Sequence, residues 1–358
     1  MARLFESFQL RGITFPNRIG VAPMCQYQAV EGRAQEWHLV HYGGLAQGGA
    51  GLVIVEAAAV RPEGRITPFD LGLWSDEHIE PLRPVARFMA SMGAVPGIQL
   101  AHAGRKAAQD VPWRGGQPLG DKGWKTIAPS ALAFDEGFPA PHALKFSEIE
   151  ELPRAFAQAA RRALEAGFQV IEIHAAHGYL LHQFLSPLTN QRQDAYGGDL
   201  EGRCRLPLEV VEAVRAAVPQ SLPLLVRISA TDWMEGGWDL PSSIALAKAL
   251  KARGVDLVDV SSGGLSAQAV VPFAPNYQVP FARAIRHEAQ VPTSAVGLIT
   301  EAVQAEAILT EASADLVLLG RECLRDPRWP LRAAQTLDAT VPWPAPYARG
   351  ARSKVPVR

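Results

Sequence analysis

The stretch that decides the fold runs from residue 147 to residue 175 and reads SEIEELPRAFAQAARRALEAGFQVIEIHA. Its first part predicts an amphipathic helix over Ile149–Ala166, because Ser147 and Glu150 have capping-box spacing and apolar residues then recur on one face. Gly167 follows the last turn, where a left-handed residue commonly ends a helix. The apolar run Val170–Ala175 then predicts a strand. A helix, a glycine and a strand in this order are typical of a βαβ unit.

Short apolar runs of the same kind recur along the rest of the chain. Together with Val170–Ala175, the expected strands are Arg18–Met24, Gly51–Val60, Val95–Ala101, Leu224–Ser229, Leu257–Ser261, Thr293–Gly297 and Leu316–Gly320. Helical patterns at Pro241–Arg253 and Glu301–Glu311 separate some of them. Nearly continuous apolar runs indicate parallel strands that are buried on both faces. Since no linker interrupts the series, the sequence predicts one (β/α)8 TIM-barrel domain over residues 1–358 rather than an open doubly wound sheet.

Three segments lie outside this alternation. Leu4–Pro16 is expected to form a small hairpin that closes the bottom of the barrel. The stretch 103–146 follows the third strand, is rich in Gly, Pro and Trp, and is only weakly periodic. A loop of that length is usually functional, so we expect a lid there. The tail 340–358 follows the last strand and helix of the barrel.

Composition excludes several classes of protein. The 358 residues carry a formal net charge of −1 and no basic stripe, which argues against a nucleic-acid partner. No apolar run has the length of a membrane helix, so no membrane partner is expected. The three cysteines (Cys25, Cys204 and Cys323) lie far apart, which argues against a disulfide framework or a metal cluster. These features predict a reduced, cytoplasmic, soluble protein.

Glycines and an arginine at the ends of the last two strands suggest a phosphate site. In TIM barrels the active site lies at the carboxyl ends of the strands, and the loops after strands seven and eight commonly bind phosphate. The seventh strand is expected to end at Gly297. The eighth is followed by Gly320, which allows close backbone approach, and by Arg321, which adds a charged fork. The alternative is a tight turn with Arg321 in a surface ion pair.

Two histidines and a tyrosine follow the fourth strand in the order His174-Ala-Ala-His177-Gly-Tyr179. Two neutral imidazoles could hold one carbonyl oxygen and stabilise charge that develops on it, with Tyr179 as a general acid. Two other readings stay open. The pair could be core histidines, or it could bind a metal with Glu172 or His182 as a third ligand, as in a metal-dependent barrel hydrolase.

Three further polar residues lie at or near strand ends. Cys25 is a lone thiol, which is more often a small buried hydrophobe than a reactive group. Gln99 and Arg227 could be structural residues that fill the mouth of the barrel. A cation at Arg227 would also suit an anionic cofactor ring.

With these residues in view, the sequence resembles the Old Yellow Enzyme family of flavin-dependent ene-reductases, in its bacterial Cys-containing branch of NADPH dehydrogenases and xenobiotic reductases. The matching phrases run in order from about residue 3 to residue 349. They are Asn17–Ile19, Pro23–Tyr27, Val55–Ala57, Gly64–Thr67, Gly97–Lys106, Ile171–Tyr179, Leu185–Arg192, Asp194–Gly198 and Gly320-Arg321.

The resemblance implies noncovalent FMN at the mouth of the barrel. The positions that match flavin contacts in the family are Ala22, Pro23, Met24, Cys25, Ala57, Gln99, Arg227, Gly297, Gly320 and Arg321. By this resemblance Gln99 bonds the pyrimidine edge, Arg227 stabilises negative charge on the ring, and Cys25 tunes its potential. NADPH is the implied hydride donor to flavin N5. After it leaves, an α,β-unsaturated carbonyl compound receives the hydride in the same space, a ping-pong scheme.

The resemblance also assigns the substrate side. His174 and His177 hold the carbonyl oxygen, Tyr179 gives the proton, and Tyr27 lines the pocket. Arg349 matches an arginine that relatives send into the neighbouring subunit, which implies a homodimer or homotetramer; residues 351–358 continue beyond that pattern. A flavin redox sensor based on Cys25 is the other function left open.

Overall fold

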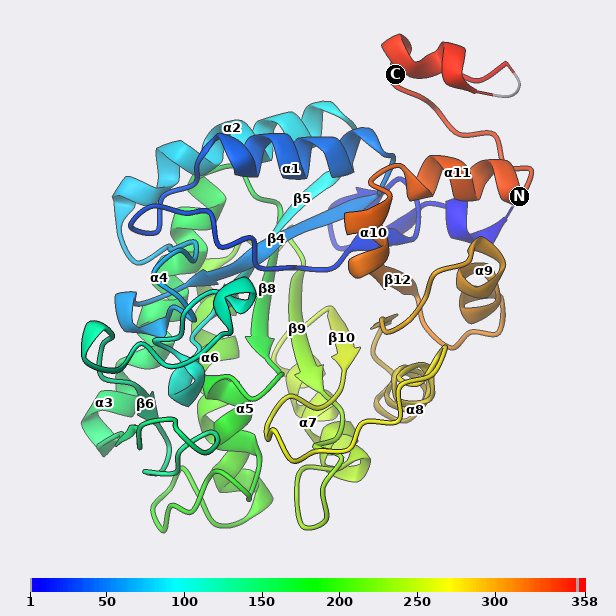
Figure 1. Ribbon diagram of the computed structural model, residues 1–358. Helices are drawn as coiled ribbons and strands as arrows, with labels where there is room; N and C mark the ends of the chain where they lie inside the picture. The colour runs from blue at the N-terminus through cyan, green and yellow to red at the C-terminus, as the bar shows by residue number, and fades with distance from the viewer. Residues whose placement is uncertain (1, 352–353) are drawn as a thin grey trace.

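Eight parallel strands close into one barrel in the computed structural model, which describes residues 2–351 and 354–358. Around the barrel the strands follow the order β10-β11-β12-β3-β4-β5-β8-β9, and β9 pairs with β10 to close it. Their bounds are β3 Ile19–Val21, β4 Leu52–Ala59, β5 Val95–Ala101, β8 Val170–Ala175, β9 Leu224–Ser229, β10 Leu257–Ser261, β11 Thr293–Ala295 and β12 Leu316–Leu319. The predicted (β/α)8 barrel is confirmed (Figure 1).

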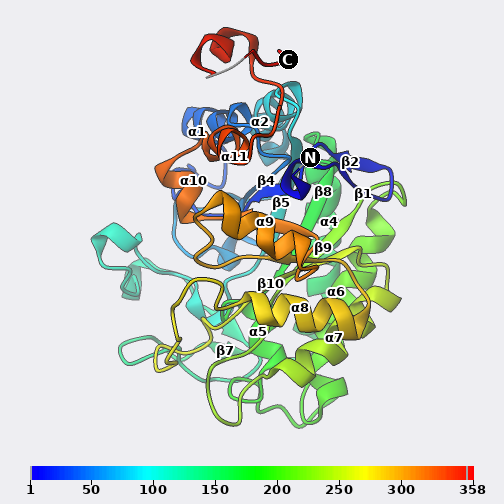
Figure 2. The ribbon, with the colours of Figure 1, turned by 90° about the vertical axis from the view of Figure 1, so that its right-hand side faces the viewer.

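Helices surround the barrel and cover the outer faces of its strands (Figures 1 and 2). They are α1 Glu36–Gln47, α2 Ile79–Ser91, α3 Phe146–Glu150, α4 Leu152–Glu165, α5 Leu180–Leu185, α6 Leu200–Ala217, α7 Leu240–Ala252, α8 Val279–Ala289, α9 Ala302–Thr310, α10 Arg321–Arg325 and α11 Trp329–Thr336. The main core lies between the strands and these helices, as in α4, where Phe156, Ala159 and Ala163 are fully buried. None of the helices in the described part of the chain is both long and apolar enough to cross a membrane.

The N-terminal hairpin closes one end of the barrel, as the sequence predicts. It consists of β1 Phe8–Leu10 and β2 Ile13–Phe15, which pair antiparallel. Leu10 and Phe15 belong to a second core cluster inside the barrel. Their partners include residues at or near the first positions of the barrel strands, namely Leu52, Val95, Val170, Leu225, Leu257 and Leu316. The opposite end, at the carboxyl ends of the strands, is therefore the open mouth.

The helix expected over Ile149–Ala166 is divided into two. α3 begins at Phe146, because Glu148 rather than Glu150 accepts the hydrogen bond from the Lys145 N–H, at 2.7 Å. The predicted capping role of Ser147 is therefore wrong. α4 starts anew at Leu152, since Pro153 lacks an N–H and is tolerated only in the first turn of a helix. Gly167 does have the expected left-handed conformation, with φ at +101°.

Two strands end at least two residues earlier than predicted, and each has a physical reason. β3 stops at Val21, two residues before Pro23, which cannot donate a hydrogen bond to a neighbouring strand. β11 stops at Ala295, because Gly297 and Leu298 have left-handed backbone conformations, with φ of +111° and +51°. Both early ends leave backbone at the mouth free to form loops.

Short elements rather than long ones make up the segment 103–146. It contains the 3-10 turns η4 Gly104–Lys106, η5 Pro112–Arg114 and η6 Gly120–Lys122, and the two-residue strands β6 Ile127–Ala128 and β7 His142–Ala143. Trp124 ties it to the loop after β4 by donating a hydrogen bond to the Glu63 carbonyl at 2.8 Å. The tail after α11 extends away from the barrel in both views (Figures 1 and 2).

Candidate active site

A layer of polar side chains crosses the inside of the barrel below its mouth. On one side Gln99 Nε2 donates to Glu172 Oε1 at 2.8 Å. On the other side Arg227 Nε lies 3.0 Å from Asp259 Oδ2, and Ser294 donates to the second oxygen of Asp259 at 2.7 Å. Burial raises the pKa of both Glu172 and Asp259. The layer therefore places one cation among carboxyl groups that hold protons more tightly than usual.

This layer fits the cofactor that the sequence implies. Within the described residues, the side-chain amide oxygen of Gln99 and the two terminal nitrogens of Arg227 take part in no hydrogen bond, although both side chains are buried. An amide and a cation with free polar atoms at the mouth suit the edge of a flavin ring, which carries acceptors and donors and becomes negative on reduction. Ala57 is the register partner of Gln99, so it lies beside this position.

The residues predicted to bind phosphate line one hollow. Gly297, Gly320 and Arg321 all contribute to it, with Thr300 and Arg325 at its edge. Arg321 makes no ion pair within the described part of the chain, which does not support the alternative of a surface ion pair. The structure thus brings the two strand ends together as a place that an anionic phosphate fits.

The end of β3 contributes Ala22, Pro23, Met24 and Cys25 to the same mouth. Ala22 is buried and donates its N–H to the Leu319 carbonyl at 2.9 Å. A Cβ on Gly320 would lie 3.7 Å from the Met24 sulfur, so β3 and the phosphate hollow adjoin. Burial, followed by the charges of the nearby carboxylates, raises the pKa of the Cys25 thiol. A thiol held protonated in this way is a poor nucleophile, which disfavours the redox-sensor reading.

A buried carboxylate supports the backbone beside Cys25. Glu56 Oε2 accepts a hydrogen bond from the Gln26 N–H at 2.8 Å, and Oε1 accepts one from the Tyr42 hydroxyl at 3.0 Å. His38 Nε2 lies 3.5 Å from the same Oε1. Burial raises the pKa of Glu56 to about 8. The network fixes the chain at the point where Cys25 and Tyr27 enter the site.

His174 and His177 lie side by side, with ring centroids 5.1 Å apart. The Nδ1 atom of His174 accepts the Ala176 N–H at 3.2 Å, so its proton is on Nε2. The Nε2 atom of His177 lies 2.7 Å from Ser261 Oγ. Burial and then the Arg227 charge lower the pKa of both histidines well below the usual value, so both are neutral. Each ring keeps one nitrogen that forms no hydrogen bond with the residues that the structure describes.

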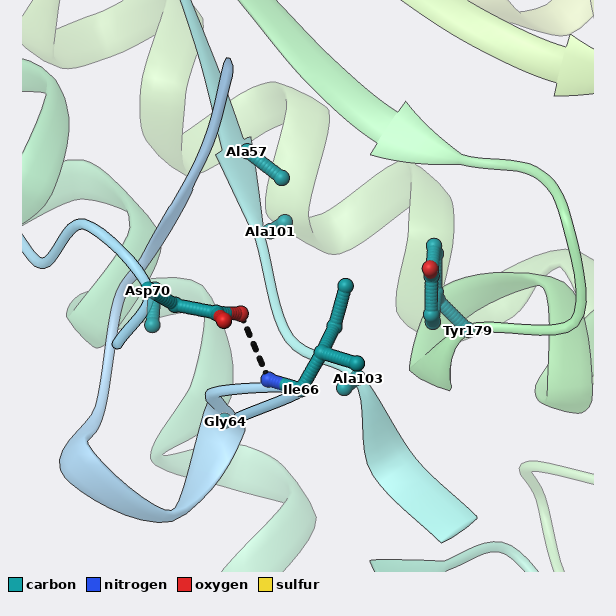
Figure 3. A pocket seen from close by; sticks show the side chains of 8 residues that line it. Ala57, Gly64, Ile66, Asp70, Ala101, Ala103 and Tyr179 are labelled. Atoms are coloured by element: carbon teal, nitrogen blue, oxygen red, sulfur yellow. Dashed lines mark hydrogen bonds between the residues drawn. The ribbon is translucent and has the colours of Figure 1, made fainter. Parts of the chain in front are cut away.

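Two tyrosines complete this side of the mouth. Tyr179 lies with its ring centroid 5.0 Å from that of His174, and it packs with Cys25 and Tyr27 around the small cluster of Ile66 and neighbouring alanines. Burial raises the pKa of both tyrosines, so both hydroxyls carry a proton. Figure 3 shows Tyr179 across the pocket from Ile66 and Asp70.

Among the described residues, the two that could have been a third metal ligand beside the histidine pair are engaged elsewhere. His182 Nδ1 accepts the Gly178 N–H at 2.8 Å, and its Nε2 lies 2.9 Å from Asp232. Glu172 is already bonded to Gln99. Within residues 2–351 and 354–358, no group of three His, Cys, Asp or Glu side chains is arranged to hold a metal ion.

Several residues of the site were not predicted. Ser229 accepts the His177 N–H at 2.9 Å, and Ser261 contacts the ring of the same histidine. Lys106 donates to the carbonyls of His177 and Gly264, at 2.9 and 2.8 Å, and burial lowers its pKa to about 8. Both serines are the last residues of predicted strands, so examining every strand end would have identified them. Lys106 ends the phrase Gly97–Lys106, in which only Gln99 was given a role.

Arg349 is not brought to this site within the chain. It is exposed in the 3-10 turn η7 Ala345–Gly350, whose Tyr347 ring packs on Arg328 after α10. The end of the tail lies at the bottom of the barrel, where Arg358 reaches the carbonyls of Ala46 and Gln47 near the last turn of α1. Arg349 therefore does not reach the mouth of its own barrel.

Comparisons with known proteins were consistent across sequence and structure. The chain matches the model of the family described as "NADH:flavin oxidoreductase / NADH oxidase family" over residues 3–340. It is 48% identical over 349 residues to a protein named NADPH dehydrogenase from Halalkalibacterium halodurans, covering 97% of this chain and 98% of that protein.

Two solved structures are similar throughout. An old yellow enzyme homologue from Zymomonas mobilis superposes with a TM-score of 0.78 at 29% identity, covering 94% of each chain. Morphinone reductase in complex with tetrahydroNAD gives a TM-score of 0.77 at 29% identity, covering 96% of this chain and 93% of the other.

Proposed function

The chain belongs to the NADH:flavin oxidoreductase / NADH oxidase family and takes FMN as its cofactor, and from this premise we propose that it is an NADPH-dependent ene-reductase. The resemblance to the Old Yellow Enzyme family drawn from the sequence is confirmed. The proposed reaction is the reduction of the activated C=C bond of an α,β-unsaturated carbonyl compound. NADPH is the proposed donor because the curated relative at 48% identity is named for it.

The observation that carries the proposal is the pair of neutral histidines with one free nitrogen each. Two N–H donors that converge on one oxygen favour negative charge on it, and that charge increases when hydride reaches the β-carbon. With its proton fixed on Nε2, His174 can donate. His177 can donate from Nδ1 when Ser261 gives its hydroxyl proton to Nε2.

The cofactor would be held by the residues at the other strand ends. Gln99 and Arg227 would bind the ring, and the hollow of Gly297, Gly320 and Arg321 would bind the phosphate. Ala22, Pro23, Met24, Cys25 and Ala57 would line the space between them. Bound FMN supplies a two-electron hydride carrier, which links the nicotinamide donor to the enone.

Tyr179 is the proposed proton donor to the α-carbon. Its pKa is raised by burial, so its hydroxyl is protonated throughout the range in which the enzyme can work. It lies beside His174, so a substrate oxygen on the histidines would place the carbon skeleton within reach of the phenol. Tyr27, from the loop after β3, would line the same pocket.

The proposed assembly is a homodimer or homotetramer in which Arg349 enters a partner's mouth. The support is the exposed position of Arg349 on a tail that extends away from its own barrel (Figure 1). The proposed lid over 103–146 rests on the position of that segment beside Tyr27, since Trp113 packs against the Tyr27 ring. A cytoplasmic location is part of the same proposal.

Steady-state kinetics with product analysis test the reaction. Under anaerobic conditions, NADPH oxidation should require 2-cyclohexenone, and the product should be cyclohexanone in equal amount. Double-reciprocal plots at several enone concentrations should be parallel, as in a ping-pong mechanism. The same turnover should persist in Cys25→Ala. Loss of turnover in that variant, with its FMN retained, would instead favour the sensor.

A further inference from the structure

A buried histidine and a buried aspartate lie behind His174 and His177, the pair proposed to hold the substrate oxygen and called the substrate clamp below. His182 is in α5 and Asp232 follows β9, and the exposed fraction of each side chain is 0%. His182 Nε2 lies 2.9 Å from Asp232 Oδ1, and His182 Nδ1 accepts the Gly178 N–H at 2.8 Å. Because Nδ1 accepts, the proton of this imidazole is on Nε2 and faces Asp232.

Asp232 is held in its charged form by several contacts. Its second oxygen accepts the Ser186 hydroxyl at 2.6 Å and the Trp238 N–H at 2.7 Å. Burial acts to raise the pKa of Asp232, but His182, Ser186 and the Trp238 N–H outweigh it, so the pKa is lowered. A buried charge is tolerated only when it is bonded in this way. The aspartate is thus a fixed negative charge, and the Nε2 atom of His182 lies 2.9 Å from it.

The backbone that His182 holds is an unusual one. His177 and Gly178 both have positive φ, at +59° and +74°, and the first of these is uncommon for a residue with a side chain. A Cβ on Gly178 would lie 2.2 Å from the Gly264 carbonyl oxygen, so the turn is pressed against the loop after β10. A strained turn persists only where its surroundings fix it. The bond from Gly178 to His182 is one such restraint.

We propose that Asp232 and His182 are positioning residues for the substrate clamp: through the Gly178 N–H they fix the turn that orients His177 and Tyr179. Neither residue touches substrate or cofactor. Each acts through the backbone of Gly178, which lies between His177 and Tyr179. The inference therefore rests on that function, and it assigns a role to a histidine that spacing alone left as a possible metal ligand.

Three substitutions of His182 separate its two contacts. His182→Asn places an amide oxygen near the position of Nδ1, so it can still accept the Gly178 N–H but does not reach Asp232. His182→Gln extends toward Asp232 and leaves Gly178 without an acceptor. His182→Phe keeps the ring and removes both contacts. Ser243→Ala is the matched control, because Ser243 bonds Trp238 Nε1 and the Ala230 carbonyl in the same region without contacting His182.

The measurements are made on FMN-loaded protein. They are FMN content, the rate constant for reoxidation by 2-cyclohexenone after anaerobic reduction, and the dissociation constant of 4-hydroxybenzaldehyde from the change in flavin absorbance. In His182→Phe we expect about a tenfold loss in both the rate constant and ligand affinity, the size of one lost buried hydrogen bond, with FMN content unchanged. His182→Asn should recover part of the loss, because it keeps the contact with Gly178 but not the one with Asp232, and His182→Gln should recover none of it.

The outcomes distinguish this inference from the proposed function. If the unsubstituted enzyme is not reoxidised by the enone, the proposed function fails. If it is reoxidised and all three His182 variants behave like Ser243→Ala, the positioning role is wrong. If His182→Phe does not fold, Asp232→Asn tests the positioning role instead, because the NH2 group of the asparagine side chain would face the Nε2–H of His182 and could not accept its proton. An affinity for 4-hydroxybenzaldehyde equal to that of the unsubstituted enzyme would overturn the inference.

Discussion

The Nε2 atom of His177 lies 2.7 Å from the Oγ atom of Ser261, across the gap between the ends of β8 and β10. Among the described residues the hydroxyl has one other acceptor, Gln278 Oε1 at 3.2 Å, and that oxygen already accepts a hydrogen bond from the Ser262 hydroxyl at 2.7 Å. The Ser261 hydroxyl therefore donates its hydrogen bond to Nε2 of His177. This arrangement leaves the His177 proton on Nδ1, where it can serve a ligand.

Ser261→Ala should remove that preference and weaken the clamp. Without the serine, the proton of His177 can move to Nε2, and Nδ1 then presents a lone pair to the carbonyl oxygen. We expect the affinity for 4-hydroxybenzaldehyde to fall about tenfold. Titration of the FMN-loaded variant measures this, with Ser266→Ala as a control on a partly buried serine in the loop after β10. An unchanged dissociation constant would show that Ser261 does not set the tautomer.

Replacing both clamp histidines should separate substrate binding from cofactor binding. In the variant with His174→Ala and His177→Ala, enone and phenol binding should weaken by at least about a hundredfold, since two donors to one developing charge are lost. Bound FMN should remain, because its proposed contacts lie on other strands. Absorbance of the purified protein and a ligand titration give both answers. Loss of the flavin would place these histidines in the cofactor site.

Tyr179→Phe should affect one half of the reaction. Removing a general acid costs about 10²–10⁴ in the step that it catalyses, and only the transfer to the enone needs the proton. Reoxidation by 2-cyclohexenone should therefore slow much more than reduction by NADPH. Stopped-flow absorbance follows both phases. Equal slowing of the two phases would exclude Tyr179 as the proton donor.

Arg321→Ala should weaken FMN binding without altering the fold. A charge-assisted hydrogen bond contributes about 1.5–3 kcal/mol, so the dissociation constant of FMN should rise about 10- to 100-fold. Arg87→Ala removes the same charge from an exposed position on α2 and serves as the control. Titration of flavin-free protein with FMN, followed by fluorescence quenching, compares the two. Equal affinities would remove Arg321 from the phosphate site.

Glu56→Gln should change how stability depends on pH. The folded protein holds the Glu56 proton up to about pH 8, whereas an unfolded chain releases it near pH 4.5. Folding therefore keeps a proton that the unfolded chain loses, and the protein loses stability as pH rises from 4.5 to 8. The variant lacks this loss. The difference between its Tm and that of the unsubstituted protein should therefore shift in favour of the variant by about 2–4 °C or more from pH 5 to pH 8.

Differential scanning calorimetry of FMN-loaded proteins at both pH values gives the comparison. Glu201→Gln, on an exposed glutamate of α6, should show no such gain. A constant difference between Glu56→Gln and the unsubstituted protein would mean that Glu56 is ionised at pH 5.

The barrel was predictable from sequence because parallel strands buried on both faces are continuous apolar runs. β5, β8, β9 and β10 begin and end at the predicted residues. The start of the helix near Ser147 was not predictable from sequence. Whether Glu148 or Glu150 caps it depends on the backbone conformation at Lys145. Spacing also identified His174, His177 and Tyr179 as neighbours. Spacing could not show that Ser261 contacts His177 or that Asp232 contacts His182, because these contacts join strands and loops that are distant along the chain.

The central claim is that electrons pass from NADPH to an enone through this one site, and an anaerobic two-step experiment tests it most directly. The protein is first titrated with one equivalent of NADPH, and the flavin absorbance near 450 nm should bleach. 2-Cyclohexenone is then added without oxygen. The account predicts full return of the absorbance with one equivalent of cyclohexanone formed, and much slower return in the variant with His174→Ala and His177→Ala. Bleaching by NADPH followed by no return on addition of the enone would contradict it.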